Sequence, residues 1–307
     1  MMTNKTTYHE AVMLKESTEA LDIKENGTYV DATYGGGGHS KEILKNLKSG
    51  KLYAFDQDPD SEKQKVDSSQ LIFINQNFRF ISNYLKLYKA IPIDGLIADL
   101  GISSHQIDTN ERGFAFRTDG PLDMRMSQQG DLTAKKIINE YSEDELTGIF
   151  KLYGELKNAR QIAKKICNHR IDNPIESTGQ LVKCLEGIFP SRFSNKFLAQ
   201  VFQALRIEVN GEMQALKDLL NQCGEVVKEN GRIAFITYHS LEDRLVKNYI
   251  RSGNFTGSLD KDFFGNVLKP FEAVNRKPIL PKEDELSRNN RSRSAKLRIA
   301  RKINVGK

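Results

Sequence analysis

Hydrophobic and polar residues alternate in short blocks over the first hundred positions of the chain. β-branched and aromatic runs predict four strands at residues 28–33, 51–56, 71–74 and 93–100. Between them apolar residues recur every three or four positions, as Ile43, Leu44 and Leu47 do, which is typical of helices. Strands that alternate with helices predict a parallel sheet with right-handed crossovers.

The alternation stops near residue 100, and the next clear strand pattern is at 232–238. A crossover needs only about a dozen residues, so this interval is far too long for one. Its periodicity is helical, and Ser142 and Ser177, each followed three residues later by Glu or Gln, predict capped helix starts. We therefore expect a helical subdomain, residues 105–210, inserted into one doubly wound α/β domain made of residues 1–104 and 211–307.

Beyond the insertion, an apolar stripe from Met213 to Val227 predicts the next crossover helix. A helix at 240–251 follows, and two further strands are expected near 271–274 and 296–302.

Composition is that of a globular protein, with 38% hydrophobic and 28% charged residues. No apolar run approaches the roughly 20 residues that span a bilayer, and the polar residues 1–10 do not look like a secretory signal. Three widely spaced cysteines fit neither a disulfide framework nor a zinc site. We expect a cytoplasmic protein without a metal.

The positive charge is concentrated at one end of the chain. Residues 288–307 hold eight basic and no acidic side chains, whereas the remaining residues hold 38 basic and 40 acidic ones. Such a cluster favours nucleic acid. The candidate RNA-binding residues are Arg291, Arg293, Lys296 and Arg298. The alternative is that these cations pair with acids such as Glu283 or Asp284.

Four consecutive glycines, Gly35 to Gly38, lie between the first strand and the following helix, where doubly wound sheets bind ligands. A dinucleotide fingerprint would need a further glycine in place of Ser40. The acid Asp31 before alternately spaced glycines instead favours S-adenosylmethionine, although Thr33 replaces one glycine.

Two more acids end strands at the same edge of the predicted sheet. Asp56 follows the last glycine by 18 residues, the place of an acid that accepts ribose hydroxyls. Asp99 closes the fourth strand, so we expect it in the site as well.

The chain resembles the MraW-like ribosomal RNA small subunit methyltransferase H family from residue 8 to about residue 301. The matching blocks include Asp99-Leu-Gly-Ile-Ser-Ser-His-Gln106, Arg112-Gly-Phe-Ala-Phe, Gly120-Pro-Leu-Asp-Met-Arg-Met126, Phe202-Gln-Ala-Leu-Arg-Ile-Glu-Val-Asn210, His239-Ser-Leu-Glu-Asp-Arg244 and Asn290-Arg-Ser-Arg-Ser-Ala-Lys-Leu-Arg298. Two departures are small: His105 stands where the family often has proline, and Tyr34 where it often has phenylalanine.

The resemblance implies a class I S-adenosylmethionine-dependent methyltransferase sheet with an inserted α-helical, substrate-binding subdomain. It implies methyl transfer to the N4 amine of a P-site cytidine, cytidine 1402 in conventional numbering, in 16S rRNA, free or within the small ribosomal subunit. The family's cofactor contacts fall on Gly37, Gly38, His39, Asp56, Phe78, Asp99 and Gln106.

A cytosine amine is a poor nucleophile, so catalysis needs positioning and an acceptor for an amine proton. Candidate acceptors are Asp99, Ser103 and Ser104. An extruded base would stack on Phe114, Phe116 or Tyr238, each of which would otherwise be a core residue. His239 is either a base or a local hydrogen-bonding group, and Asp123 and Arg125 either serve the site or pair with each other.

Three other functions stay open at this point. They are methylation of another amine-bearing nucleic acid base, a non-catalytic RNA-binding role in ribosome assembly, and a nicotinamide-dependent oxidoreductase. Ser40 and the basic end disfavour the last of these.

Overall fold

The structure, a computed structural model, describes residues 11–189 and 194–304. The chain divides into two compact units: the first joins the residues up to Gly101 with those from Met213 onward, and the second is Ile102–Glu212. The boundaries expected from the sequence, at 104 and 211, lie within three residues of these. Residues 1–10, on which the expectation about a secretory signal depended, lie outside the described part. No helix within the described ranges is long and apolar enough to cross a membrane.

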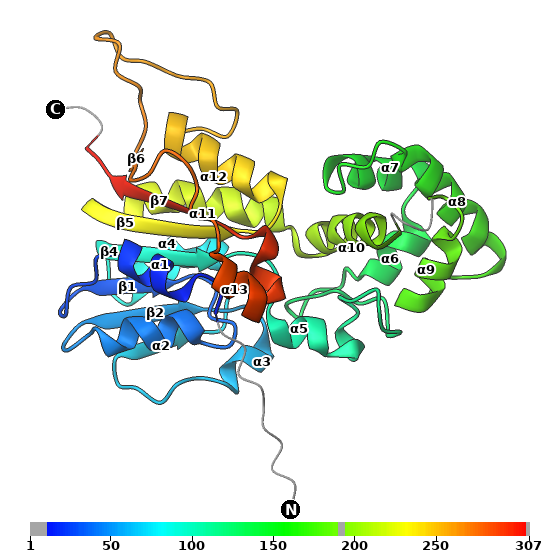
Figure 1. Cartoon of the computed structure of the whole chain (residues 1–307), viewed down its shortest axis with the longest axis horizontal. Helices are drawn as coiled ribbons and strands as arrows, with labels where there is room; N and C mark the ends of the chain where they lie inside the picture. The colour runs from blue at the N-terminus through cyan, green and yellow to red at the C-terminus, as the bar shows by residue number, and fades with distance from the viewer. Residues whose placement is uncertain (1–10, 190–193, 305–307) are drawn as a thin grey trace, which may run out of the picture. The chain divides into compact units, whose positions relative to one another are not determined.

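The first unit is built on a seven-stranded sheet with the order β3-β2-β1-β4-β5-β7-β6 (Figure 1). Its strands are β1 (Thr28–Asp31), β2 (Lys51–Phe55), β3 (Leu71–Ile74), β4 (Ile93–Asp99), β5 (Val227–Thr237), β6 (Phe271–Ala273) and β7 (Lys296–Lys302). Strands β1 to β5 are parallel, and β7 is antiparallel to β5 and β6. The predicted doubly wound sheet is confirmed, and its order reverses between β1 and β4, where such folds bind ligands.

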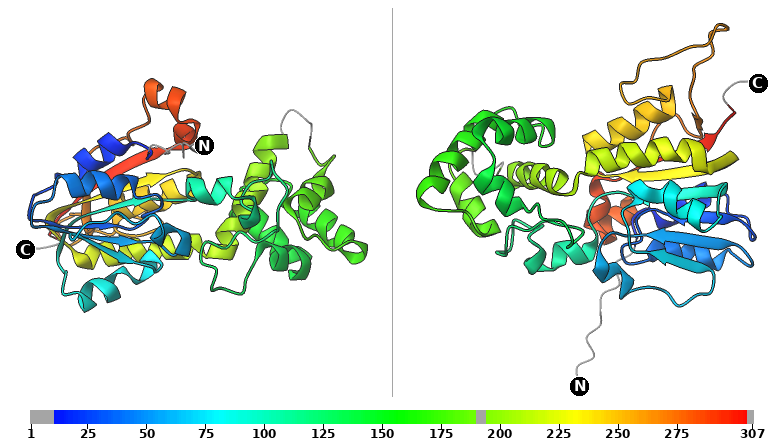
Figure 2. Two further views of the ribbon diagram at one scale, coloured as in Figure 1. Left: turned by 90° about the horizontal axis from the view of Figure 1, so that it is seen from below. Right: turned by 180° about the vertical axis from the view of Figure 1, so that it is seen from behind.

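Helices cover both faces of this sheet, as the two views in Figure 2 show. They are α1 (Leu14–Ala20), α2 (Gly38–Lys45), α3 (Pro59–Glu62), α4 (Ile81–Leu87), α11 (Glu212–Val226), α12 (Ser240–Ser252) and α13 (Glu283–Arg288), with 3-10 turns η1 (Phe78–Phe80) and η4 (Asn290–Ser294). Successive strand residues point to opposite faces. Tyr29 is therefore buried with side chains of α1 and α2, whereas Val30 is buried with side chains of α4, α11 and α12.

Strand β5 starts five residues earlier than the predicted 232. Residues 228–230 at its start are exposed and polar, so no apolar pattern marked them as a strand. Pairing with β4 is continuous only from Arg232 onward.

The second unit is helical. Its elements are α5 (Ser104–Asp108), η2 (Asn110–Arg112), α6 (Ala134–Glu140), α7 (Glu143–Leu152), α8 (Ala159–Asp172), α9 (Thr178–Leu185) and α10 (Ser194–Asn210). The predicted capping boxes at Ser142 and Ser177 are confirmed as the starts of α7 and α9. The loop before α6 is cross-linked by buried Arg112, which donates to the carbonyl oxygens of Arg125 and Met126 at 2.9 and 3.1 Å.

Candidate active site

Three acids end adjacent strands at one edge of the sheet. Asp31 is the last residue of β1, Asp56 directly follows β2, and Asp99 is the last residue of β4. Because β2, β1 and β4 are neighbours and parallel, the three carboxyl groups gather at the carboxyl edge. The sequence prediction that Asp56 and Asp99 share an edge is confirmed.

The glycine turn is held between two of these acids. Asp31 accepts hydrogen bonds from the amide N of Thr33 at 3.0 Å and from Oγ of Ser40 at 2.7 Å. Asp56 accepts from the amide N of Gly35 at 2.8 Å. The two carboxylates therefore fix the path of the backbone between β1 and α2.

Glycine is required within this turn for conformational and steric reasons. Gly37 has φ +75°, and a Cβ there would lie 2.5 Å from Oη of Tyr34. Gly36 differs, since the only atom near its Cβ position is Oε1 of Gln64 at 3.7 Å. The side chain of Tyr34 thus packs against the turn at Gly37, whereas there is open space beside Gly36.

Asp99 at this edge has a raised pKa. Burial, together with the nearby carboxyl groups of Asp31, Glu242 and Glu285, raises the pKa of Asp99 to about 7, against the hydrogen bond from Tyr238, which favours the carboxylate. Oη of Tyr238 donates to Oδ1 of Asp99 at 2.6 Å. A carboxyl group with this pKa exchanges its proton near neutral pH, as a general base must.

His39 faces the same acid but remains neutral. Burial lowers the pKa of His39 to about 4, and its Nε2 lies 3.1 Å from the carbonyl oxygen of Val12. The 3.9 Å separation between its Nδ1 and Oδ2 of Asp99 is therefore not an ion pair at neutral pH.

The hydroxyl group of Tyr238 contacts Asp99, a contact that the sequence did not predict. Sequence reasoning offered it as a platform for a base, whereas its hydroxyl is bonded to Asp99. The signal was present in the strand order, since Tyr238 directly follows β5 and Asp99 pairs with Ile236 near the end of that strand.

The other aromatic candidates belong to the core of the second unit. Phe114 is buried among its helices, and Phe116 packs edge-to-face on Phe202 with ring centroids 5.7 Å apart. Phe114 is therefore a core residue, the alternative that the sequence left open, whereas Phe116 is half-buried and its role as a stacking platform stays a prediction. In the first unit, Phe78 begins η1 after β3 and is half-buried.

Ser103 and Gln106 form a capping box that starts α5. Oγ of Ser103 accepts from the amide N of Gln106 at 3.2 Å, and Oε1 of Gln106 accepts from the amide N of Ser103 at 3.0 Å. Ser104, the first residue of α5, is half-buried. Sequence reasoning missed this cap, although the Ser-x-x-Gln spacing carries it.

Local contacts match one of the two alternatives left open for Asp123 and Arg125 and for His239. Asp123 and Arg125 pair with each other through two bonds of 2.9 and 2.7 Å. His239 caps α12, with Nδ1 accepting from the amide N of Glu242 at 3.4 Å and Nε2 lying 3.1 Å from Oε1 of Glu242.

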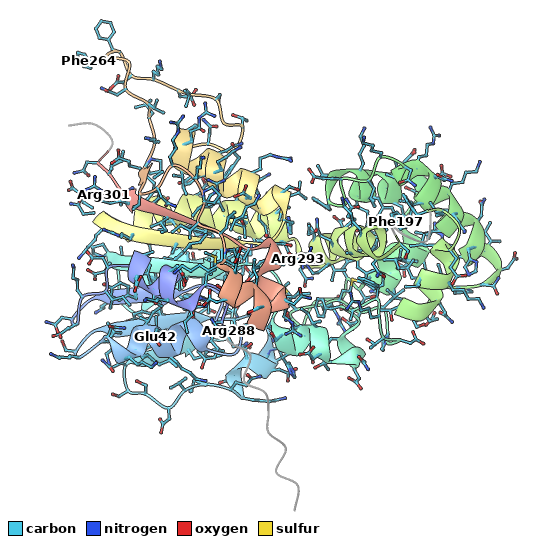
Figure 3. The ribbon with its side chains drawn as sticks, viewed as in Figure 1. Glu42, Phe197, Phe264, Arg288, Arg293 and Arg301 are labelled. Carbon is cyan, nitrogen blue, oxygen red and sulfur yellow. The ribbon has the colours of Figure 1, made fainter. Side chains whose placement is uncertain are left out.

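Two cations of the basic end pair with an acid on helix α12. Arg298 forms an ion pair with Asp243 of α12 at 2.6 Å, and Lys296 approaches the same carboxylate at 3.5 Å. The acid that pairs with Lys296 and Arg298 is thus Asp243, whereas Asp284, one of the acids suggested from the sequence, pairs with Arg288 of the basic end at 3.4 Å. Arg293 is exposed (Figure 3).

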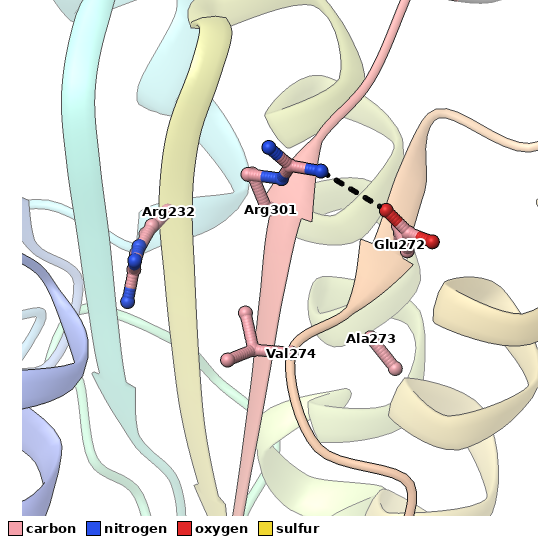
Figure 4. Close-up of a pocket in the computed structure, with 5 residues that line it drawn as sticks. All are labelled: Arg232, Glu272, Ala273, Val274 and Arg301. Carbon is pink, nitrogen blue, oxygen red and sulfur yellow. Dashed lines mark hydrogen bonds and ion pairs between the residues drawn. The ribbon is translucent and has the colours of Figure 1, made fainter.

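A surface hollow of about 270 Å³ lies away from the acids (Figure 4). It is lined by Arg232, Glu272, Ala273, Val274 and Arg301. Because Arg232 pairs with Gly95 near the start of β4, the hollow is at the sheet edge opposite Asp99. One of its two arginines, Arg301, is paired with Glu272 at 3.1 Å.

The chain has close relatives of known family. A family model described as the MraW methylase family matches residues 6–303. The ribosomal RNA small subunit methyltransferase H of Bacteroides fragilis strain YCH46 is 51% identical over 303 residues, covering 98% of this chain and 100% of the relative. That of Cytophaga hutchinsonii is 54% identical over 295 residues, covering 95% and 99%.

The similarity of this chain to solved structures is weaker than its similarity to these relatives. An rRNA methylase from Streptococcus thermophilus has a TM-score of 0.42 and 11% identity, covering 94% of this chain and 95% of its own. An overlap of this size transfers no site residue.

The match over almost the whole chain agrees with what the residues show, a seven-stranded doubly wound sheet with acids and a glycine turn at its switch point. The chain therefore belongs to the MraW methylase family and is a class I methyltransferase that uses S-adenosylmethionine.

Proposed function

We propose that this methyltransferase modifies the RNA of the small ribosomal subunit in the cytoplasm, at the N4 amine of P-site cytidine 1402 of 16S rRNA. The names of the relatives support ribosomal RNA as the substrate class. The observation that carries the chemistry is the half-buried Asp99 carboxyl at the sheet edge, whose pKa of about 7 suits an acceptor for an amine proton.

The residues at the sheet edge fit the cofactor. S-adenosylmethionine supplies a methyl group on a positively charged sulfonium. The position of Asp56 directly after β2 supports the proposal that it accepts hydrogen bonds from ribose hydroxyls, and the negative charge of this acidic edge suits a cationic ligand. The open side of the turn at Gly36 leaves room for a ligand beside the backbone. The proposed contacts are Gly37, Gly38, His39, Asp56, Phe78, Asp99 and Gln106.

Asp99 is the best-supported acceptor for the amine proton. Tyr238 bonds to Oδ1, which leaves Oδ2 to receive the proton. Ser103 is a weaker candidate because its hydroxyl already caps α5, and Ser104 is the remaining one.

Substrate binding is assigned to the inserted helical unit and to the basic end. Phosphate contacts are proposed for Arg291, Arg293, Lys296 and Arg298. Exposure favours Arg293 most, since Arg298 and Lys296 share Asp243.

The proposed function is tested by mass spectrometry of 16S rRNA from cells lacking this protein. We expect loss of the N4-methyl group at cytidine 1402, restored by the wild-type chain but not by Asp99→Asn. Loss of a methyl group from another amine-bearing base would favour the alternative methylase. Intact methylation with defective subunit assembly would favour the non-catalytic role.

Replacing Asp56 should weaken cofactor binding. Asp56→Ala removes a charged acceptor, so S-adenosylmethionine affinity measured by calorimetry should fall by roughly 2–4 kcal/mol. Ser61→Ala is the matched control, because it deletes the hydroxyl that bonds to Asp56 at 2.7 Å but keeps the carboxylate. It should cost no more than about 1 kcal/mol. Equal affinity of Asp56→Ala and wild type would reject the ribose assignment.

The pH profile of the enzyme should report Asp99. Because the base acts as a carboxylate and its pKa is raised to about 7, kcat/KM for S-adenosylmethionine should rise with pH through about 7 to a plateau. Tyr238→Phe removes a hydrogen bond that favours the carboxylate, so the rise should move to higher pH. Asp99→Asn should lower kcat at least about 100-fold. An unmoved profile in Tyr238→Phe would contradict this role of Asp99.

Salt dependence separates the two roles of the basic end. Arg293→Gln should reduce the log–log slope of RNA affinity against salt by about 0.7–0.9, because one phosphate contact and its counterion release are lost. Arg298→Gln breaks the pair with Asp243, so it should lower the melting temperature. If Arg293→Gln keeps the wild-type slope, Arg293 does not contact phosphate.

A further inference from the structure

The loop between α12 and β6, residues 253–270, exposes two adjacent aromatic rings at its tip. The side chain of Phe263 is 97% exposed and that of Phe264 is 84% exposed. In Figure 3, Phe264 lies at the far end of this loop, beyond the sheet and helices of the first unit. We call residues 260–268 the finger. Exposed neighbouring aromatics usually mark an interaction site.

The turn at the tip of the finger is closed by its own hydrogen bonds. Oδ1 of Asp262 accepts from the amide N atoms of Phe264 and Asn266 at 2.9 and 2.8 Å, and Oδ2 accepts from Nδ2 of Asn266 at 3.0 Å. The amide N of Asp262 donates to the carbonyl oxygen of Asn266 at 2.9 Å. Gly265, with φ +88°, completes the turn. The ring exposure is therefore a consequence of the backbone geometry.

The charge around the finger favours a polyanion. Residues 247–277 hold six basic and three acidic side chains. All three acids are already bonded within the protein: Asp262 as above, Asp260 to Nδ2 of Asn254 at 3.3 Å, and Glu272 to Arg301 at 3.1 Å. Bonds from neutral amide groups leave Asp260 and Asp262 charged, and residues 247–277 as a whole carry a net charge of +3. Aromatic rings with flanking cations are the usual means of binding unpaired bases.

The finger is too far from the acidic edge to touch the target base. Helix α12 begins just after Tyr238 and has 13 residues, which extend about 20 Å. The finger leaves from the other end of this helix (Figure 1). Its partner must reach from the acidic edge across at least that distance, which a folded RNA can do and a single nucleotide cannot.

We propose that Phe263 and Phe264 stack on unpaired bases of the ribosomal RNA substrate, at a site remote from the methylated cytidine. This inference rests on the proposed function, because it takes small-subunit RNA as the substrate. The rings lie at 86° to each other with centroids 5.6 Å apart. Each ring therefore presents its own face, and together they hold two separated bases.

Kinetics on small ribosomal subunits from cells lacking this protein test the inference. Phe263→Ala combined with Phe264→Ala should raise KM for the subunit at least about tenfold and leave kcat within about twofold, because the finger binds substrate away from the chemistry. S-adenosylmethionine affinity should not change. Phe263→Trp with Phe264→Trp should keep a KM near wild type, since indole rings also stack. Exposed Leu87 on α4 supplies the control, and Leu87→Ala should have no effect.

Photocrosslinking identifies the partner. Benzoylphenylalanine in place of Phe263 should form adducts with 16S rRNA that nuclease removes, whereas the same replacement of Leu87 should not. Adducts with ribosomal proteins alone would overturn the RNA assignment in favour of protein docking. An alanine double variant with wild-type KM would overturn the inference while leaving the proposed function intact. If the wild-type chain transfers no methyl group to the subunit or to free 16S rRNA, the proposed function itself is wrong.

Discussion

The geometry of the acidic edge depends on the hydrogen bonds of one buried carboxylate, that of Asp31. It accepts from Thr33 and from Ser40, so it fixes both ends of the glycine turn. Thr33 in turn accepts a hydrogen bond at its Oγ1 from the amide N of Asp99, at 2.6 Å. One acid therefore joins β1, the turn, the start of α2 and the end of β4. Glycine can adopt many backbone conformations. The contacts of Asp31 hold the glycine turn in one of them.

Gathering acids at this edge opposes folding. Burial raises the pKa of Asp31 to about 6 and that of Asp99 to about 7. The charge of Asp56 raises the pKa of Asp31 further, and the charge of Asp31 raises that of Asp99. Since both values exceed the unfolded value of 3.8, the folded state holds more protons than the unfolded state. The two acids therefore lower stability as pH rises from about 4 to 7. A cationic cofactor relieves this repulsion, so the same charges that weaken the free protein favour its ligand.

The sheet and its additions have separate tasks. The switch point between β1 and β4 is proposed to hold the groups for methyl transfer, and this arrangement is compatible with many substrates. The inserted helical unit, the basic end and the finger are additions to that sheet, and each is proposed to recognise RNA. Part of their polar chemistry instead stabilises the fold, as the pairing of Arg298 with Asp243 and the burial of Arg112 show.

The sequence by itself determined the strands, the helix starts at Ser142 and Ser177, and the glycine turn followed by Asp56, because periodicity, caps and turns depend on neighbours in the chain. It missed the start of β5, where exposed polar residues carry no apolar pattern. Only the tertiary structure decided that Tyr238 bonds to Asp99, 139 positions away, and that Arg298 pairs with Asp243, 55 positions away. Such partners are chosen by strand order and helix packing, which bring together side chains that no local pattern relates.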